Sequence, residues 1–424
     1  MRSFVQLSLG VPTTGFGLLR STILDALSSF DVRLGTTVQD RLPLRVNMHV
    51  NHGPVLSAEK RQNPHGDGKY LPVLDGWRAV AIILVLLFHG FYNSKLKGYP
   101  RLENFGELTG RTGALGVLVF FCISGYLITQ RLLAESRTTG MFSLRAFYIK
   151  RIFRILPPLV TYLLVALGLY WLSIIRLNVC DWAAPLFLTN YISGGSWFTS
   201  HFWSLSVEEH FYLFWPCCVL IVGWRRAMWA GIFLISAIAV WRPWKLAHVT
   251  HQAGTLQHTD MRLDYILMGA IVALLTAFYP RTVILFKRIG TPPGLLTLFL
   301  LLLLSTSRSR VDLRSLQAIL LTLIVCASTI ADSRFIRWLL TGAPVLFVGR
   351  ISYSLYVWQQ LLLAPSSNPF WSSPLALPLK FAAALLVAYI SFRFVEKPFI
   401  RYGRSFLATS EAPDHARAKE VEHI

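Results

Sequence analysis

Residues 77–93 read WRAVAIILVLLFHGFYN, an apolar stretch with Arg78 near its start and His89 near its end. On a helix, eleven steps of about 100° return to nearly the same azimuth, so both side chains would lie on one face. At about 1.5 Å per residue they would be roughly 16 Å apart, about half the thickness of a bilayer core. Ionisable groups inside a membrane are costly and usually face a bundle interior or a wet cavity. We therefore expect the functional site to include this pair.

The composition of the chain is that of a membrane protein. Hydrophobic residues make up 54% of its 424 residues and charged residues only 15%, and the mean hydropathy is +0.50; soluble domains are more polar. The net charge of +20 would suggest nucleic-acid binding in a soluble protein. Here the basic residues lie mostly between apolar runs, where they orient a chain in a bilayer. We expect the lipid bilayer, and no nucleic acid, among the partners. The five cysteines have no metal-ligand spacing, so we expect no metal site.

About ten apolar runs are candidate membrane spans, several of them short or carrying polar residues, so the predicted fold is an all-α, polytopic bundle of about ten transmembrane helices. The runs lie near residues 77–93, 113–134, 153–175, 204–222, 227–243, 262–279, 293–305, 316–332, 343–364 and 375–395. The start of the seventh run is interrupted by Gly290, Pro292, Pro293 and Gly294. Residues 71–403 form the predicted membrane domain. Residues 1–70 are expected to be a poorly ordered cytoplasmic extension, and residues 404–424 a cytoplasmic tail.

Basic residues recur after every second apolar run. They lie within 137–154, at 225–226, and within 281–288, 334–337 and 397–404. The positive-inside rule then predicts a multi-pass protein of the cell membrane with both termini in the cytoplasm. One predicted outer loop is an exception, because it carries Arg308, Arg310 and Arg314. This topology places Arg78 at the cytoplasmic end of the first run and His89 toward its outer half.

The fourth run begins with FWSLSVEEHFYLFWP at residues 202–216 and would enter the membrane from the outer side. Ser204, Glu208 and Tyr212 share one helical face through their i, i+4 spacing, whereas Glu209 points about 100° away. This spacing predicts that the first three side chains line one wall of a polar cavity.

Further polar residues are expected at the same outer end of the bundle. Arg262 and Asp264 open the sixth run. An imidazole, two carboxylates and this Arg–Asp pair could meet in one outer-facing cavity, with Arg262 and Asp264 holding its rim. His201 and His210 are expected to be exposed at the outer interface. Four glycines inside the runs, Gly116, Gly125, Gly269 and Gly349, are predicted to be close-packing positions between helices.

Seven stretches occur in the order LDGWRAVAIILVLLFHGF, LGVLVFFCISGYLIT, FYIKRIFRILPPL, FWSLSVEEHFYLFWP, RLDYILMGA, GRISYSLYVW and VEKPF. Together they resemble the acyltransferase 3 family of integral-membrane acyltransferases, which includes bacterial O-acetyltransferases of surface polysaccharides. The resemblance covers residues 72–403. It implies transfer of an acyl group, usually acetyl from acetyl-CoA, to a hydroxyl of a carbohydrate, a glycolipid or another acceptor. Acyl-CoA would be a donor substrate and no cofactor would be bound permanently; protein partners stay open.

The resemblance also assigns residues. The Arg-X10-His motif of the family matches Arg78 and His89, and its RxxR stretch matches Arg151 and Arg154. Its Trp-Ser-Leu…Glu-Glu stretch matches Trp203, Ser204, Leu205, Glu208 and Glu209. The chain departs from the family at YVWQQL, where members often read YLWHWP, so Gln359 stands where a histidine is common. We expect no esterase-like domain after the last run, and therefore expect any activity to reside in the membrane domain.

These residue types fit acyl transfer. A hydroxyl is a poor nucleophile until a base takes its proton, and His89 is the natural general base because imidazole titrates nearest neutral pH. Glu208 or Glu209 could hold the tautomer of His89, as the acid does in a Ser-His-Asp triad. Arg78, Arg151 and Arg154 could bind the phosphates of CoA through charge-assisted hydrogen bonds. Direct transfer and an acyl-histidine intermediate both remain open.

Other interpretations stay open beside these. His89 could be a helix-packing residue, and the arginines could serve only to anchor and orient the chain. Glu208 could be a buried structural partner of Arg262. A transporter or flippase of glycan precursors would also have a polar cavity, but it should show broken helices at matching positions in two halves. A scaffold in an envelope polysaccharide complex would leave His89 dispensable.

Overall fold

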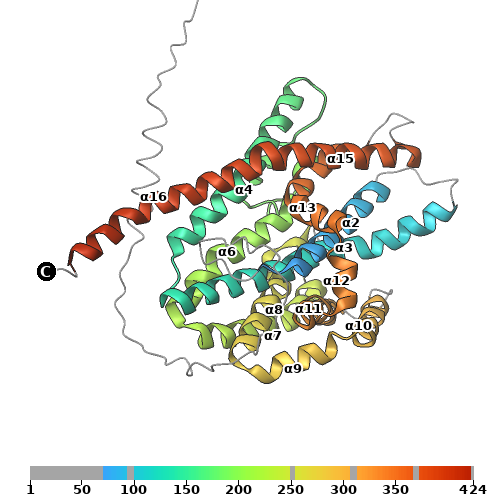
Figure 1. The fold of residues 1–424 in the computed structure, drawn as a ribbon. Coiled ribbons are helices and arrows are strands. Elements are labelled where there is room, and N and C mark those ends of the chain that lie inside the picture. Colours follow the sequence, from blue (N-terminus) through green and yellow to red (C-terminus); the bar gives the residue numbers. More distant parts are fainter. Residues whose placement is uncertain (1–69, 93–99, 249–253, 306–312, 366–371, 422–424) are drawn as a thin grey trace, which may run out of the picture. The chain divides into compact units, whose positions relative to one another are not determined.

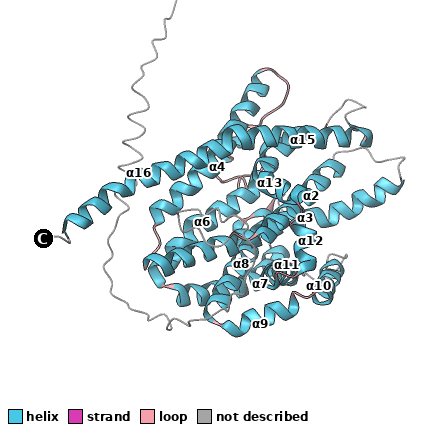
Figure 2. Cartoon of the chain, viewed as in Figure 1, coloured by secondary structure: helices cyan, strands magenta, loops and turns pink. Residues whose placement is uncertain are grey.

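The computed structural model describes residues 70–92, 100–248, 254–305, 313–365 and 372–421. In this part of the chain all regular structure is helical, with no strand (Figures 1 and 2). The predicted all-α fold is therefore confirmed. Apart from residue 70, the expected N-terminal extension over residues 1–70 lies outside the described residues.

The helices follow the predicted order of apolar runs. Among the described residues, eight helices are long and apolar enough to cross a membrane, or ten if each of two bent helix pairs counts as one span. The chain is thus a polytopic membrane helix bundle. The elements are α2 (Pro72–Tyr92), α3 (Pro100–Thr139), α4 (Leu144–Trp171), α5 (Trp197–Ser200), α6 (Phe202–Val222), α7 (Trp224–His248), η2 (Thr255–Gln257), α8 (Thr259–Phe278), α9 (Pro280–Ile289), α10 (Pro292–Ser305), α11 (Arg314–Ala331), α12 (Arg334–Leu340), α13 (Ala343–Leu362), α15 (Leu377–Ser391), η4 (Phe392–Glu396) and α16 (Lys397–Val421).

The two bent pairs have identifiable breaks. Helices α9 and α10 meet at 78°, at the Gly290–Gly294 segment that interrupts the seventh run in the sequence. Helices α12 and α13 meet at 62°, where Gly342 precedes a helix with proline in its first turn. Proline is tolerated at a helix start but cannot continue the hydrogen bonding of a preceding helix, so both bends follow from local sequence.

The outer surface of the bundle is apolar. Large hydrophobic side chains on α6 and α7 are largely exposed, including Ile221 at 75%, Phe233 at 71% and Val240 at 73%. In water such exposure over successive turns would be costly, whereas lipid tails solvate it. These faces are the ones that the bilayer covers.

Glycine allows the central helices to approach each other closely. A Cβ on Gly125 of α3 would collide with the carbonyl oxygen of Ile266, and one on Gly269 of α8 with that of Cys122. The other two predicted close-packing glycines, Gly116 and Gly349, meet the carbonyl oxygens of Ala81 and Asp75 in the same way. All four predictions are confirmed, because each glycine lies against the backbone of a neighbouring helix.

Two contacts, one at each end of α2, show how this helix lies against α13. Gly349 of α13 packs on Asp75 near the start of α2, and Gln359, further along α13, bonds His89 near the end of α2. The two helices therefore run in the same direction. Helix α6 runs the opposite way, since Trp197 just before it contacts the ring of His89.

The last helix continues past the predicted end of the membrane domain. Helix α16 crosses the expected boundary between residues 403 and 404 and lies beside α4 (Figure 1). Gly403 packs on the Phe153 side chain, and the rings of Phe153 and Tyr402 are 5.4 Å apart. The first turn of the predicted tail is also attached to the bundle, because the rings of Phe406 and Phe153 are 6.3 Å apart and Leu407 is buried.

Replacing Gly125 with alanine should destabilise the bundle by about 1–3 kcal/mol, because a methyl group would force α3 away from the backbone of α8. Gly168→Ala in α4 is the matched control, since a Cβ there meets nothing within 4 Å; it should be neutral or slightly stabilising. Tryptophan-fluorescence unfolding of the purified full chain in detergent measures both. Equal stability of the two variants would contradict the close-packing role.

Candidate functional site

A polar cavity of about 90 Å³ lies between α2, α3, α4, α6 and α13. A single water needs only about 10–15 Å³ on this measure, so the cavity has room for several waters or a slender polar chain. Its polar lining consists of Arg78, Ser124, Arg131, Arg151, Arg154, Ser204, Glu208, Tyr212, Ser352, Tyr353 and Tyr356. Of the ten residues singled out in the sequence, six therefore meet here: Arg78, Arg151, Arg154, Ser204, Glu208 and Tyr212.

Positive charge dominates the cavity wall. Four guanidinium groups face a single carboxylate, that of Glu208. Neighbouring groups offset part of this charge: Arg78 pairs with Asp75 at 2.7 Å, and the Arg151 guanidinium lies 4.1 Å from the ring centre of Tyr212. A concave wall with excess arginine is suited to an anionic ligand. Among the described residues no group of three His, Cys, Asp or Glu side chains is arranged to hold a metal ion.

Glu208 is held by hydroxyl groups. Its carboxylate accepts hydrogen bonds from Ser124 Oγ at 3.1 Å and from Tyr212 Oη at 3.0 Å. The predicted shared face of Ser204, Glu208 and Tyr212 is confirmed, because all three line the cavity. Glu209 points elsewhere, as its offset of 100° implies, and its buried Oε1 has no hydrogen-bond partner among the described residues.

The expectation that both glutamates meet His89 in one outer-facing cavity is wrong. The fourth span begins at Trp197 rather than at residue 204, and the indole of Trp197 is the group that contacts His89, with ring centres 5.5 Å apart. Glu208 lies eleven residues further along this span, which is about 16 Å of helix. The carboxylate therefore lies with the arginines, at the opposite end of α2 from His89.

His89 has a different hydrogen-bond partner from those predicted. Its Nδ1 lies 3.0 Å from Oε1 of Gln359. Gln359 then donates through Nε2 to Oε1 of Gln360 at 3.1 Å, and Gln360 donates to the carbonyl oxygen of Trp197 at 2.9 Å. Sequence reasoning noticed Gln359 only as a departure from a family pattern. The i, i+11 spacing within α2 carries no information about which residue of α13 faces His89.

The two histidines of the fourth span, His201 and His210, are not exposed at an interface. His201 is only 3% exposed, and its Nε2 lies 3.2 Å from the carbonyl oxygen of Val357. His210 is half-buried and its Nδ1 lies 2.7 Å from Thr259 Oγ1. The prediction of exposure is wrong for both. For His201 the reason is that the span starts at Trp197, about two turns before the apolar run at residue 204.

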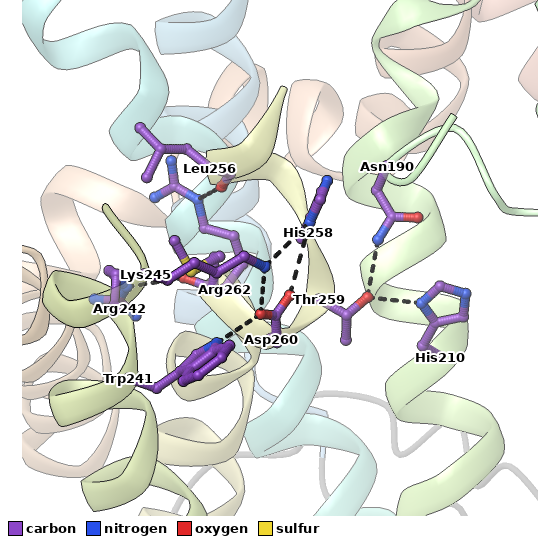
Figure 3. Close-up of polar contacts among 11 residues, drawn as sticks. Asn190, His210, Trp241, Arg242, Lys245, Leu256, His258, Thr259, Asp260 and Arg262 are labelled. Atoms are coloured by element: carbon purple, nitrogen blue, oxygen red, sulfur yellow. Dashed lines mark hydrogen bonds and ion pairs between the residues drawn. The ribbon is translucent and has the colours of Figure 1, made fainter. Parts of the chain in front are cut away.

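Arg262 and Asp264, which the sequence analysis places together at the rim of a cavity, bond different partners. Asp264 bonds Arg242 of α7 at 2.5 Å, and the Arg242 guanidinium, which is fully buried, also donates to the carbonyl of Met261 at 3.0 Å. Arg262 instead donates to the carbonyl of Leu256 at 2.7 Å (Figure 3). Residues 262 and 264 are about 200° apart on a helix, so they face different neighbours.

These contacts belong to a polar cluster that joins α6, α7 and α8 (Figure 3). Asp260 pairs with Lys245 at 2.8 Å and accepts from the Trp241 indole at 2.8 Å. Thr259 Oγ1 lies within hydrogen-bond distance of Asn190 and His210. Each link joins two different elements, so the cluster explains how the ends of these helices are held together and supports an architectural role for Arg262 and Asp264.

Comparison with known proteins identifies relatives of the chain. The profile of the family described as "Acyltransferase domain" matches residues 71–393. The protein named "Putative O-acetyltransferase SACOL0978" from Staphylococcus aureus (strain COL) is 28% identical over 365 residues, which is 79% of this chain and 58% of the relative. O-acetyltransferase OatA from S. aureus (strain NCTC 8325 / PS 47) is 27% identical over 374 residues, 81% of this chain and 59% of the relative. The chain thus spans less than two thirds of the length of these relatives. No solved structure matches.

Replacing Asp264 with alanine should cost about 3–5 kcal/mol of unfolding free energy, because it leaves the buried Arg242 without its counter-ion. Asp260→Ala is the matched control, since the Asp260–Lys245 pair is partly exposed and should be worth less than about 1 kcal/mol. The double variant Arg242→Met/Asp264→Leu should recover most of the loss. Unfolding of the purified chain by SDS titration compares the four proteins. Similar losses for Asp264→Ala and Asp260→Ala would rule out this account of the pair.

Proposed function

The chain belongs to the acyltransferase 3 family, and from this we propose that it is a membrane-embedded O-acyltransferase. It transfers an acyl group, acetyl in our proposal, from acetyl-CoA to a hydroxyl of a carbohydrate or glycolipid. One observation carries the proposal: helix α2 joins an arginine-lined cavity at Arg78 to a hydrogen-bonded histidine at His89. One end of α2 would thus contribute to binding of an anionic donor, and the other end would carry the base for a hydroxyl acceptor.

The arginine-lined cavity is the proposed donor site. Coenzyme A carries several phosphate groups, and arginine binds phosphate through short, often bidentate, charge-assisted hydrogen bonds. Arg78, Arg151 and Arg154 converge there from α2 and α4. With the termini in the cytoplasm of an inner-membrane protein, which is part of the proposal, this end of the bundle faces the compartment that supplies acyl-CoA. The acyl arm would then extend about 16 Å along α2 to reach His89.

His89 is the proposed general base. Its Nε2 takes the proton of the acceptor hydroxyl while the hydroxyl oxygen attacks the thioester carbonyl. The tetrahedral intermediate then collapses, the C–S bond breaks, and the leaving thiolate of CoA takes the proton from the imidazolium. An acyl-imidazole intermediate would use the same nitrogen and the same donor. Both routes need His89 and no metal or permanently bound cofactor.

Glu208 and Glu209 have a different part in this proposal from that expected of the acid in a triad. Glu208 accepts from Tyr212 and Ser124 within the arginine-lined cavity. This supports a role in offsetting the charge of the arginines and in holding Tyr212 against Arg151. Glu209 lies outside the lining and is assigned no contact with substrate.

A transporter is less well supported. Inverted-repeat transporters have broken helices at corresponding positions of their two halves, and the substrate site lies at those breaks. The two bent pairs among the described helices, α9–α10 and α12–α13, both lie in the second half of the chain. The cavity is lined by α2, α3, α4, α6 and α13, so it draws on only one of the bent pairs.

His89→Ala should abolish transfer, because general-base catalysis contributes about 10²–10⁴-fold to rate. The measurement is the ester-linked acyl content of surface glycans, by NMR, in a deletion strain complemented with each variant. His248→Ala, an exposed histidine at the end of α7, is the control and should restore wild-type ester content. Immunoblots of membranes establish equal abundance. If His89→Ala restores the ester signal as fully as His248→Ala does, then His89 is not the base.

Arg151→Ala and Arg154→Ala should each weaken binding of acetyl-CoA about ten- to hundredfold, the equilibrium worth of a charge-assisted hydrogen bond. Binding of acetyl-CoA to the purified full chain in nanodiscs, by isothermal titration calorimetry, measures this. Arg225→Ala removes an exposed arginine from the start of α7 and controls for net charge. Equal affinities in all four proteins would show that the cavity does not bind the donor.

A further inference from the structure

The position of the proton on His89 follows from the hydrogen bonds behind it. The chain of contacts ends at the carbonyl oxygen of Trp197, which can only accept. Gln360 Nε2 lies 2.9 Å from this oxygen, so this end of the Gln360 amide is its NH₂ group. Ser200 gives a second anchor: its hydroxyl donates to the same carbonyl at 3.0 Å, and its oxygen accepts from Gln360 Nε2 at 3.1 Å.

The orientation of the Gln360 amide then determines the orientation of the Gln359 amide. Because the NH₂ group of Gln360 faces Trp197, its Oε1 faces Gln359 and must accept, from Gln359 Nε2 at 3.1 Å. The Oε1 of Gln359 is therefore turned to Nδ1 of His89 at 3.0 Å. An amide oxygen cannot donate, so Nδ1 carries the hydrogen and Nε2 carries the lone pair.

Flipping the two glutamine amides to the opposite orientation would cost free energy. If both amides flipped, the Gln360 oxygen would face the Trp197 carbonyl oxygen, and two acceptors would meet without a proton between them. Both glutamine side chains are buried, at 0% and 1% exposure, so water cannot repair the contact. The Trp197 indole also donates to the backbone carbonyl of Gln360 at 2.8 Å, which holds the two segments in register.

We propose that Gln359 and Gln360 are positioning residues that hold His89 as the Nδ1–H tautomer, with Nε2 as the basic nitrogen. The first half of this statement concerns only hydrogen bonding; the second half rests on the proposed function. A neutral amide does here what a carboxylate does in a Ser-His-Asp triad, namely orienting the ring and selecting its tautomer. Unlike a carboxylate, it adds no net charge beside the imidazole.

His201 supplies an internal reference for this inference. Its Nε2 lies 3.2 Å from the Val357 carbonyl oxygen, which also can only accept, so His201 carries its hydrogen on Nε2. His89, which is half-buried, and His201, which is buried, therefore hold opposite tautomers. A single ¹⁵N spectrum of the neutral protein distinguishes them, because protonated and unprotonated ring nitrogens resonate in separate regions.

The test uses the full chain labelled with ¹⁵N-histidine in lipid nanodiscs, with His89 and His201 assigned by signals lost in His89→Asn and His201→Asn. We expect a protonated Nδ1 and a bare Nε2 for His89, and the reverse for His201. A protonated Nε2 on His89 in the wild-type protein would overturn the proposal whatever the variants do, so the test does not depend on any variant folding.

Variants then test which residues set the tautomer. Gln359→Leu removes the acceptor and should release His89 into a mixture of tautomers. Gln359→Glu keeps an acceptor and should preserve the Nδ1–H form. Gln317→Leu, which removes a hydrogen-bonded glutamine of α11, is the matched control and should leave both histidines unchanged. A fully retained Nδ1–H form in Gln359→Leu would show that another group selects the tautomer.

Transfer rates separate this inference from the proposed function. Gln359→Leu should lower kcat/KM about three- to tenfold, the worth of one hydrogen bond, while Gln317→Leu leaves it unchanged. If wild-type His89 holds its hydrogen on Nδ1 but His89→Ala still transfers normally, the proposed role of His89 as the base fails and the hydrogen-bond assignment stands. If His89→Ala is inactive but the wild-type ring carries its hydrogen on Nε2, the positioning role fails and the function stands.

Discussion

Polar groups inside a membrane must find their partners within the protein, because the bilayer core has no water to offer. This constraint explains three of the polar arrangements among the described residues. The buried Arg242 guanidinium is bonded by Asp264 and by a backbone carbonyl. The amide and imidazole groups around His89 form a chain that ends on the Trp197 carbonyl. The arginines of α2 and α4 share a cavity with hydroxyl groups and one carboxylate.

The two ends of α2 meet different neighbours because the helices around it are packed backbone to backbone. Gly349 on Asp75 and Gly116 on Ala81 bring α13 and α3 against α2. As a result, one end of α2 meets the arginines of α4, and the other meets Gln359 of α13 and Trp197. The proposed donor site and the proposed base are separated by about 16 Å of helix, which would suit a donor whose reactive group lies at the end of a long arm.

Much of the fold was predictable from local pattern. The apolar runs, the interrupted seventh span and the four glycines at helix contacts follow from residue type and spacing. So does the shared face of Ser204, Glu208 and Tyr212, because i, i+4 neighbours must lie together on any helix. The errors concern contacts between helices. The fourth span starts at Trp197, outside its apolar run. For this reason the predicted depth of Glu208 was wrong, and so were its predicted partners.

The sequence by itself determined that the chain is a helical membrane bundle, and which residues share a helix face, because both depend on hydrophobicity and helical periodicity. It also supplied six of the polar residues that line the cavity, but not Ser124, Arg131, Ser352, Tyr353 or Tyr356. Only the tertiary structure decided that Glu208 lies with the arginines, that Asp264 bonds Arg242, and that Gln359 faces His89. The reason is physical: the rotation and depth of one helix relative to another are set by packing of side chains far apart in the chain, which no periodicity within a single helix encodes.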